Sequence, residues 1–132
     1  MVEGKAVTEQ EAYALTPLAL AYAGDAVFEL YVRTRLIQSG MRVPQRLHAK
    51  AVSIVRAKAQ ADRLHAVHGM LTDREQDIVR RGRNAKSGSM PKSATMADYR
   101  ASTGLEALFG YLHLSGQTER LDTVMAMIVE EI

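Results

Sequence analysis

Two long segments of the chain are helical by pattern and apolar on nearly all sides of their middles. The first is Pro17–Gln38, in which the proline suits the first turn of a helix, and the second covers residues 97–114. A Ser-Gly pair follows each segment and ends it. Because a helix that is apolar all round does not lie on a solvated surface, we expect both in a core or at a subunit interface.

The remaining segments also carry helical signals, and the period-two alternation typical of strands is absent. Residues 45–68, which follow Pro44, are helical by composition and form either one helix or two joined near Val55. Residues 117–132 predict an amphipathic last helix. We find no domain linker, so residues 1–132 are expected to form a single all-α domain.

Two capping boxes mark further helix starts. Thr8 and Glu11 have the spacing of a capping box that opens a short first helix. Thr72 and Glu75 have the same spacing and open a helix that carries Ile78.

Composition excludes several classes of protein. The chain has no cysteine, so a disulfide scaffold and thiolate metal sites are ruled out. The N-terminus lacks the basic-then-apolar pattern of a secretory signal, and no apolar run approaches the roughly 20 residues that a membrane helix needs. We therefore expect a cytoplasmic protein.

Each of the two apolar segments contains an isolated carboxylate. Asp25 interrupts LALAYAGDAVF, residues 18–28, and Glu106 is the single acid of STGLEALFGYLHL, residues 102–114. A buried carboxylate without a partner costs several kcal/mol or shifts its pKa. We therefore expect each acid to have a partner outside its own helix.

Local structural roles are the alternatives for these acids. Asp25 could cap a helix that begins after the preceding glycine, or pair with a basic side chain from elsewhere. Glu106 could close a capping box with Thr103. Both caps would lie inside what reads as continuous helix, and neither explains the apolar flanks. The nearby Arg33 is better placed for Glu29, four residues before it.

A shared metal ion would supply a partner for both acids at once. Mg²⁺ is typically held by one or two carboxylates, several waters and phosphate oxygens of the substrate. Such a site can generate a hydroxide and stabilise the leaving oxygen of a phosphodiester. We hypothesise that Asp25 and Glu106 are metal ligands and catalytic residues, with a structural role for each as the alternative.

A basic segment lies between the two apolar helices. The net charge is only +2, but no acid occurs from Ile78 to Ala97, and glycine, serine and proline predict a loop over residues 80–96. Few aromatic residues are available for base stacking, which favours a double-stranded over a single-stranded nucleic acid. The expected phosphate-gripping residues are Arg80, Arg81, Arg83, Asn84, Lys86 and Lys92, with Lys58 and Gln60 as weaker candidates.

These segments together resemble a known family. ALAYAGDAVFELYVR, residues 19–33, resembles the signature segment of ribonuclease III catalytic domains, in which a Leu-Gly-Asp-Ala-Val core lies in a long buried helix. STGLEALFGYLHL resembles the second segment of that family, with its Glu-Ala-Leu-[Ile/Phe]-Gly core. The order, the spacing and the basic segment between them are similar too, so the resemblance covers nearly the whole chain.

The chain departs from the full-length enzymes of this family at three positions. Those enzymes have glutamates where this chain has Leu18 and Ala21, and an aspartate where it has Thr103. No double-stranded-RNA-binding domain is expected after the catalytic domain. This reduced pattern resembles the short bacterial branch, the Mini-ribonucleases III, whose RRGRNAK segment is similar to residues 80–86.

The resemblance implies an all-helical homodimer in which the two signature helices pack across the two-fold axis and each subunit cuts one strand of an RNA duplex. It implies hydrolysis that depends on Mg²⁺, with Mn²⁺ as a substitute ion, and that leaves 5′-phosphate and 3′-hydroxyl ends. It further implies maturation of the precursor of the large-subunit (23S) ribosomal RNA. Two other classes stay open: a non-catalytic double-stranded-RNA-binding module, and a helical adaptor that binds a protein partner.

Overall fold

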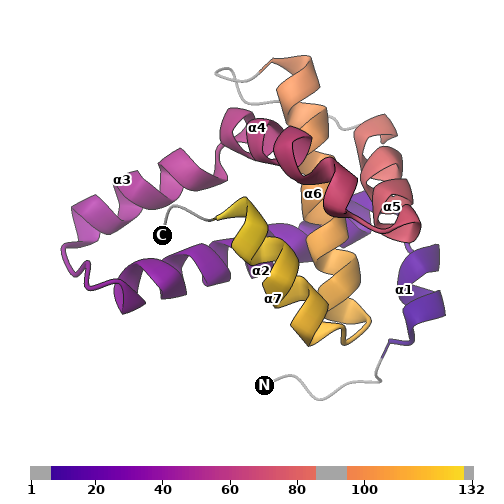
Figure 1. The fold of residues 1–132 in the computed structure, drawn as a ribbon, viewed down its shortest axis with the longest axis horizontal. Helices are drawn as coiled ribbons and strands as arrows, with labels where there is room; N and C mark the ends of the chain where they lie inside the picture. Colours follow the sequence, from indigo (N-terminus) through magenta and orange to yellow (C-terminus); the bar gives the residue numbers. More distant parts are fainter. Residues whose placement is uncertain (1–6, 86–94, 130–132) are drawn as a thin grey trace.

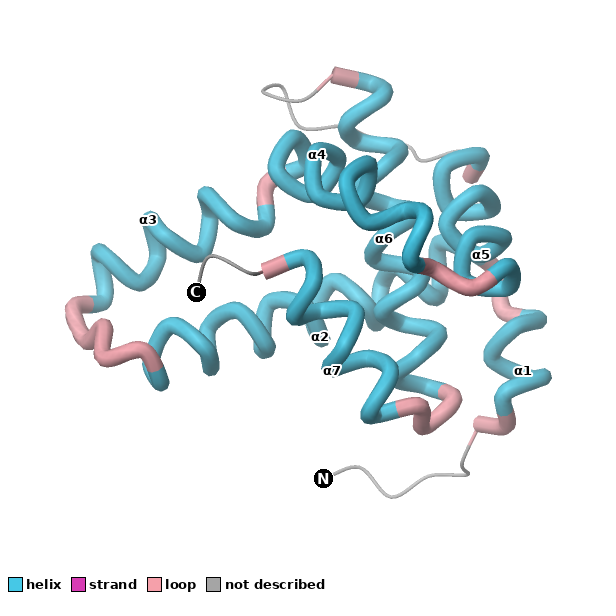
Figure 2. Tube along the Cα trace, viewed as in Figure 1, coloured by secondary structure: helices cyan, strands magenta, loops and turns pink. Residues whose placement is uncertain are grey.

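The chain folds into seven α-helices and one short 3-10 turn within residues 7–85 and 95–129, which are the residues that the computed structural model describes (Figures 1 and 2). No strand occurs in this part of the chain, so the prediction of an all-α fold is confirmed. The helices are α1 (Glu9–Ala14), α2 (Pro17–Gln38), α3 (Pro44–Val55), α4 (Ala57–Val67), α5 (Asp73–Asn84), α6 (Met96–Leu114) and α7 (Thr118–Ile128), and the 3-10 turn is His68–Met70.

Helix α6 is the central element, and α2, α4, α5 and α7 pack around it (Figure 1). Between residues 101 and 112, every side chain of α6 except that of Glu106 is buried. Phe109 stacks on Phe28 of α2 with 4.9 Å between the ring centroids. The apolar pattern of residues 97–114 therefore predicted a core helix correctly.

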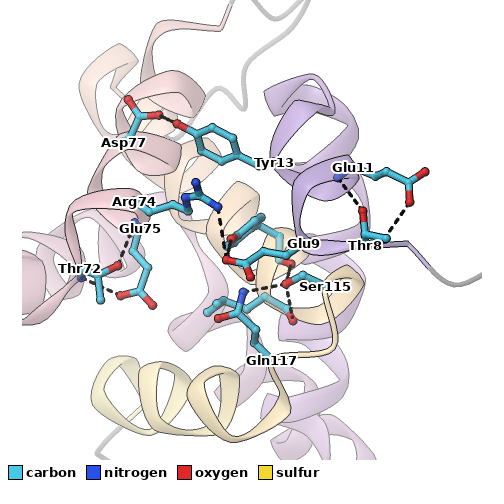
Figure 3. Close-up of polar contacts among 12 residues, drawn as sticks. Thr8, Glu9, Glu11, Tyr13, Thr72, Arg74, Glu75, Asp77, Ser115 and Gln117 are labelled. Atoms are coloured by element: carbon cyan, nitrogen blue, oxygen red, sulfur yellow. Dashed lines mark hydrogen bonds and ion pairs between the residues drawn. The ribbon is translucent and has the colours of Figure 1, made fainter.

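Both predicted capping boxes are present (Figure 3). The Thr8 hydroxyl accepts the backbone N–H of Glu11, whose carboxylate accepts the N–H of Thr8, both at 3.1 Å. Thr72 and Glu75 form the same pair, and Arg120 of α7 donates to both oxygens of Glu75 at 2.8 and 2.7 Å. This second box therefore also ties α7 to the start of α5.

Residues 45–68 form two helices and not one. The chain breaks at Arg56, whose backbone is extended (φ −62°, ψ 153°) between α3 and α4. The last helix, predicted over residues 117–132, ends at Ile128, because the backbone of Val129 leaves the helical region (φ −116°, ψ 49°).

The predicted loop over residues 80–96 is wrong at both ends. Helix α5 continues to Asn84, and α6 begins at Met96. A glycine is tolerated inside a helix where a neighbouring helix packs so closely that there is no room for a side chain. A Cβ on Gly82 would lie 2.6 Å from the Cα of Gly104. Gly82, which the sequence predicted in a loop, is thus a contact point between α5 and α6.

One face of α2 is exposed in the isolated chain, so the core of one subunit covers only part of a segment that the sequence predicted in a core or at a subunit interface. Leu18 is 42% exposed, Tyr22 87% and Leu30 69%. The opposite face, with Leu20, Phe28 and Val32, is fully buried against the core. No described helix combines the length and the apolarity that spanning a membrane requires.

Candidate active site

The two carboxylates singled out in the sequence lie in one open groove. It is formed by α2, α6 and the junction of α3 with α4, and it has a volume of about 490 Å³. Asp25 enters it from α2 and Glu106 from α6. The remaining lining residues are Leu18, Ala21, Tyr22, Val55, Arg56, Ala57, Gln60, Tyr99, Ser102 and Thr103.

Two glycines allow the helices that carry the acids to touch through their backbones. A Cβ on Gly24 would lie 1.7 Å from the carbonyl oxygen of Glu106, and a Cβ on Gly110 would lie 1.9 Å from that of Leu20. Since only glycine permits this approach, α2 and α6 cross directly beneath the two carboxylates. A backbone contact therefore sets the distance between the two helices that carry the acids.

Glu106 is mostly buried, and its partner is Gln60 of α4. The Gln60 amide nitrogen donates to a carboxylate oxygen of Glu106 at 3.1 Å. Burial raises the pKa of Glu106, and the hydrogen bond from Gln60 lowers it. The charges of Asp25 and Glu29 and a hydrogen bond with the Asp25 carboxyl raise it further. The pKa of Glu106 thus reaches about 7, compared with the ordinary 4.5. Near neutral pH, this carboxyl therefore holds a proton part of the time.

Asp25 is exposed in the isolated chain, which corrects the expectation of a buried acid. It lies on the uncovered face of α2, next to Tyr22 and Ala26, which are also exposed. Helix α2 is continuous through Gly24, so the cap alternative for Asp25 does not hold. The sequence pattern showed the apolar character of the segment but not that one of its faces stays open.

The local alternatives for Glu106 do not hold either. Helix α6 is continuous from Met96 to Leu114, and the Thr103 hydroxyl donates to the carbonyl of Tyr99 at 3.1 Å instead of capping a helix start. Arg33 pairs with Glu29 at 3.1 Å, as the spacing predicted. The role of Asp25 and Glu106 as metal ligands stays a prediction.

The three positions at which the chain lacks the acids of the larger family members line the same groove. Leu18 and Ala21 lie on α2, and Thr103 lies on α6. None of these side chains carries a charge. Within residues 7–85 and 95–129, no cluster of three or more His, Cys, Asp or Glu side chains could hold a metal ion.

Sequence reasoning placed Gln60 among weak RNA contacts and overlooked Arg56. Gln60 is 2% exposed and shares the buried face of α4 with Leu64 and Val67, so it is a polar residue at a core position. This register is visible in the sequence and could have indicated its role. Arg56 gives no such signal, because it reaches the groove only through the break between α3 and α4.

The basic residues of α5 have different surroundings. Arg80 pairs with Asp77 and is exposed. Arg83 and Asn84 line a second groove of about 520 Å³ together with Arg80 and His68. The two other predicted RNA contacts, Lys86 and Lys92, lie outside the described residues.

Arg81 holds α1 in place. Its guanidinium donates to the carbonyl oxygens of Tyr13 and Leu15, both at 2.9 Å, and lies 5.1 Å from the centre of the Tyr13 ring. Figure 3 shows two further contacts between α1 and α5: the Tyr13 hydroxyl donates to Asp77, and the Arg74 guanidinium donates to Glu9. Arg81 is thus engaged within the fold, whereas Arg83 lines the second groove.

Comparison with known proteins identifies the domain. Residues 18–117 match the Ribonuclease III domain. The Mini-ribonuclease 3 of Symbiobacterium thermophilum is 55% identical over 111 residues, which cover 84% of this chain and 85% of that protein. The Mini-ribonuclease 3 of a Thermoanaerobacter species is 43% identical over 126 residues, which cover 96% of this chain and 89% of the relative.

A solved structure shares the fold of this chain. The crystal structure of protein FN1578 from Fusobacterium nucleatum superimposes with a TM-score of 0.79 at 28% identity, covering 89% of this chain and 94% of that one. The chain therefore belongs to the ribonuclease III family, a family of endoribonucleases, and within it to the Mini-ribonuclease 3 group.

Proposed function

We propose that the chain is a Mg²⁺-dependent endoribonuclease that cuts double-stranded RNA and leaves 5′-phosphate and 3′-hydroxyl ends. The observation that carries the proposal is the pair Asp25 and Glu106, which face one open groove inside a Ribonuclease III domain. In this proposal residues 1–132 form one catalytic domain that acts in the cytoplasm on the precursor of 23S ribosomal RNA.

The residues present fit a divalent metal ion. Two neighbouring carboxylates repel each other, and the raised pKa of Glu106 reflects burial together with this repulsion. A cation between them removes the repulsion, and a set of two carboxylates in a solvent-accessible groove suits Mg²⁺ or Mn²⁺, which complete their coordination with water and phosphate oxygens. Asp25 and Glu106 would hold the ion, which when bound activates a water molecule and stabilises the leaving oxygen.

The other residues of the groove position the reacting groups. The contact between Gly24 and the backbone of Glu106 fixes where the two helices that carry the carboxylates cross. Asp25 is exposed in the isolated chain and lines the groove, where a phosphodiester can approach it. Arg56 lines the groove as a cation that can pair with a backbone phosphate.

We further propose that α5 and the segment after it grip the duplex. Arg80, Arg83 and Asn84 lie on the second groove, and Lys86 and Lys92 follow in the chain. Arg81 contributes by anchoring α1 against α5, since its guanidinium already binds two carbonyl groups. Contacts of this kind bind the phosphate backbone without reading the base sequence.

A homodimer completes the proposal. Leu18, Tyr22 and Leu30 form an exposed apolar face on α2 beside Asp25. Such a face is typical of a surface that another protein covers. Pairing of this face with a second copy would bring two grooves together, one for each RNA strand.

The test is cleavage of a long RNA duplex by Asp25→Asn and Glu106→Gln variants. Both are expected to fold and to bind duplex RNA but not to cut it, because each loses one metal ligand. Asp62→Asn is the matched control, since Asp62 is an exposed acid of α4 that pairs with Lys58. Full cleavage by either variant in Mg²⁺ would exclude the metal assignment.

Cleavage with and without EDTA, together with the salt dependence of RNA affinity, separates the rival classes. A non-catalytic RNA-binding module would leave the duplex intact whether or not EDTA is present. A protein-binding adaptor would show RNA affinity that hardly depends on salt, whereas a phosphate-gripping enzyme weakens steeply as salt rises.

A further inference from the structure

Gln60 makes an unusual set of contacts in the groove. Its side chain is 2% exposed, and its amide nitrogen donates to the carbonyl oxygen of Val55 at 2.7 Å and to Glu106 at 3.1 Å. The amide has two N–H groups, and both are used. Its carbonyl oxygen, Oε1, is buried and has no hydrogen-bond partner among the residues that the structure describes.

Packing and stability alone do not explain a glutamine at this position. A buried acceptor without a partner costs about 1–3 kcal/mol. Gln60 shares the buried face of α4 with Leu64 and Val67, so methionine or leucine would fill the same place without that cost. What an apolar residue could not provide is an N–H group directed at Glu106.

We propose that Gln60 is a positioning residue that holds the Glu106 carboxylate in the orientation required for binding the metal ion. The amide connects two fixed points: the carbonyl of Val55 at the end of α3, and the carboxylate on α6. Glu106 therefore cannot rotate without breaking a hydrogen bond. This inference rests on the proposed metal-dependent function.

The purely structural alternative is that Gln60 serves only to donate a hydrogen bond to the carbonyl of Val55 at the end of α3. The chain offers a matched control for it. The amide nitrogen of Gln76 in α5 donates to the carbonyls of His68 and Leu71 at 3.0 and 3.3 Å, in the same manner as Gln60 serves Val55. Gln76 lines the second groove and not the one that holds Glu106.

The experiment compares Gln60→Met and Gln60→Leu with Gln76→Met in the full chain. Thermal unfolding measures the structural effect, and calorimetric titration with Mn²⁺ in the absence of RNA measures metal affinity. Cleavage kinetics on a long RNA duplex in Mg²⁺ give kcat and KM separately.

We expect the Gln60 variants to lose about 10–100-fold in metal affinity or in kcat, as removal of a residue that orients a ligand does, with KM changed less than about two-fold. Gln76→Met should leave metal affinity unchanged, because Gln76 does not line the groove that holds Glu106. Unchanged metal affinity and kcat in both Gln60 variants would overturn the inference, as would a kcat that falls only with the folded fraction. Failure of the unaltered protein to bind Mn²⁺ or to cut duplex RNA would instead overturn the proposed function.

Discussion

Gly24 and Glu106 are in backbone contact: a Cβ on Gly24 would lie 1.7 Å from the Glu106 carbonyl oxygen. The residue that precedes one acid therefore touches the main chain of the other. The two carboxylates share a groove because the helices that carry them cross at this point.

This contact predicts a severe effect of Gly24→Ala. The added methyl group would overlap backbone atoms that cannot move aside, so α2 and α6 must separate. We expect a loss of about 3 kcal/mol or more in the free energy of unfolding, together with loss of duplex cleavage. Gly69→Ala is the control, because nothing lies within 4 Å of a Cβ there, and it should change stability by less than about 1 kcal/mol. Equal stability of the two variants in urea unfolding would refute the argument.

The raised pKa of Glu106 predicts how the stability of the metal-free protein depends on pH. The folded protein holds this proton up to about pH 7, whereas the unfolded chain releases it near 4.5. The contribution of the protonated Glu106 carboxyl to the free energy of unfolding is therefore fully present below pH 4.5 and is lost as the pH rises through 7. The free-energy difference between Glu106→Gln and the unaltered protein should shift by about 3 kcal/mol in favour of the variant from pH 4 to pH 8. A difference that stays constant over this range in denaturant unfolding would show that Glu106 is not desolvated.

The same pKa predicts that metal binding releases a proton. At pH 6 the Glu106 carboxyl, with a pKa of about 7, is mainly protonated, and a bound cation must displace that proton. We expect close to one proton per bound ion at pH 6 and about a tenth of one at pH 8. Calorimetry in buffers of different ionisation enthalpy measures this number. In Glu106→Gln the release should disappear, whatever affinity remains.

Arg81 and Arg83 are expected to differ although they are two residues apart. Arg83→Met should leave thermal stability unchanged and lower the affinity for duplex RNA, with a salt dependence reduced by about one charge. Arg81→Met removes the hydrogen bonds to Tyr13 and Leu15 and should destabilise the fold by about 2 kcal/mol. Filter binding at several salt concentrations and thermal unfolding of both variants check the difference. The reverse pattern would mean that Arg81 and not Arg83 contacts the RNA.

Local chemistry made much of this protein readable from its sequence. Capping boxes depend on residues three apart, so Thr8 and Thr72 indicated two helix starts correctly. The apolar segment of residues 97–114 predicted the central helix, because few other places in a fold accept such a segment. The two acids stood out for the same reason, since a charge in an apolar run needs an explanation.

What the sequence left undecided depends on pairs of residues that are distant in the chain. Gly82 was expected in a loop because glycine weakens a helix, but its contact with Gly104 outweighs that preference and extends α5 through the arginines. Asp25 was expected to be buried because the period of α2 does not show which face its neighbours leave uncovered. Gln60 meets Glu106 only because α4 packs on α6. Residue types and short spacings thus determined the helices and the chemistry available to them, whereas helix packing decided which of those groups meet.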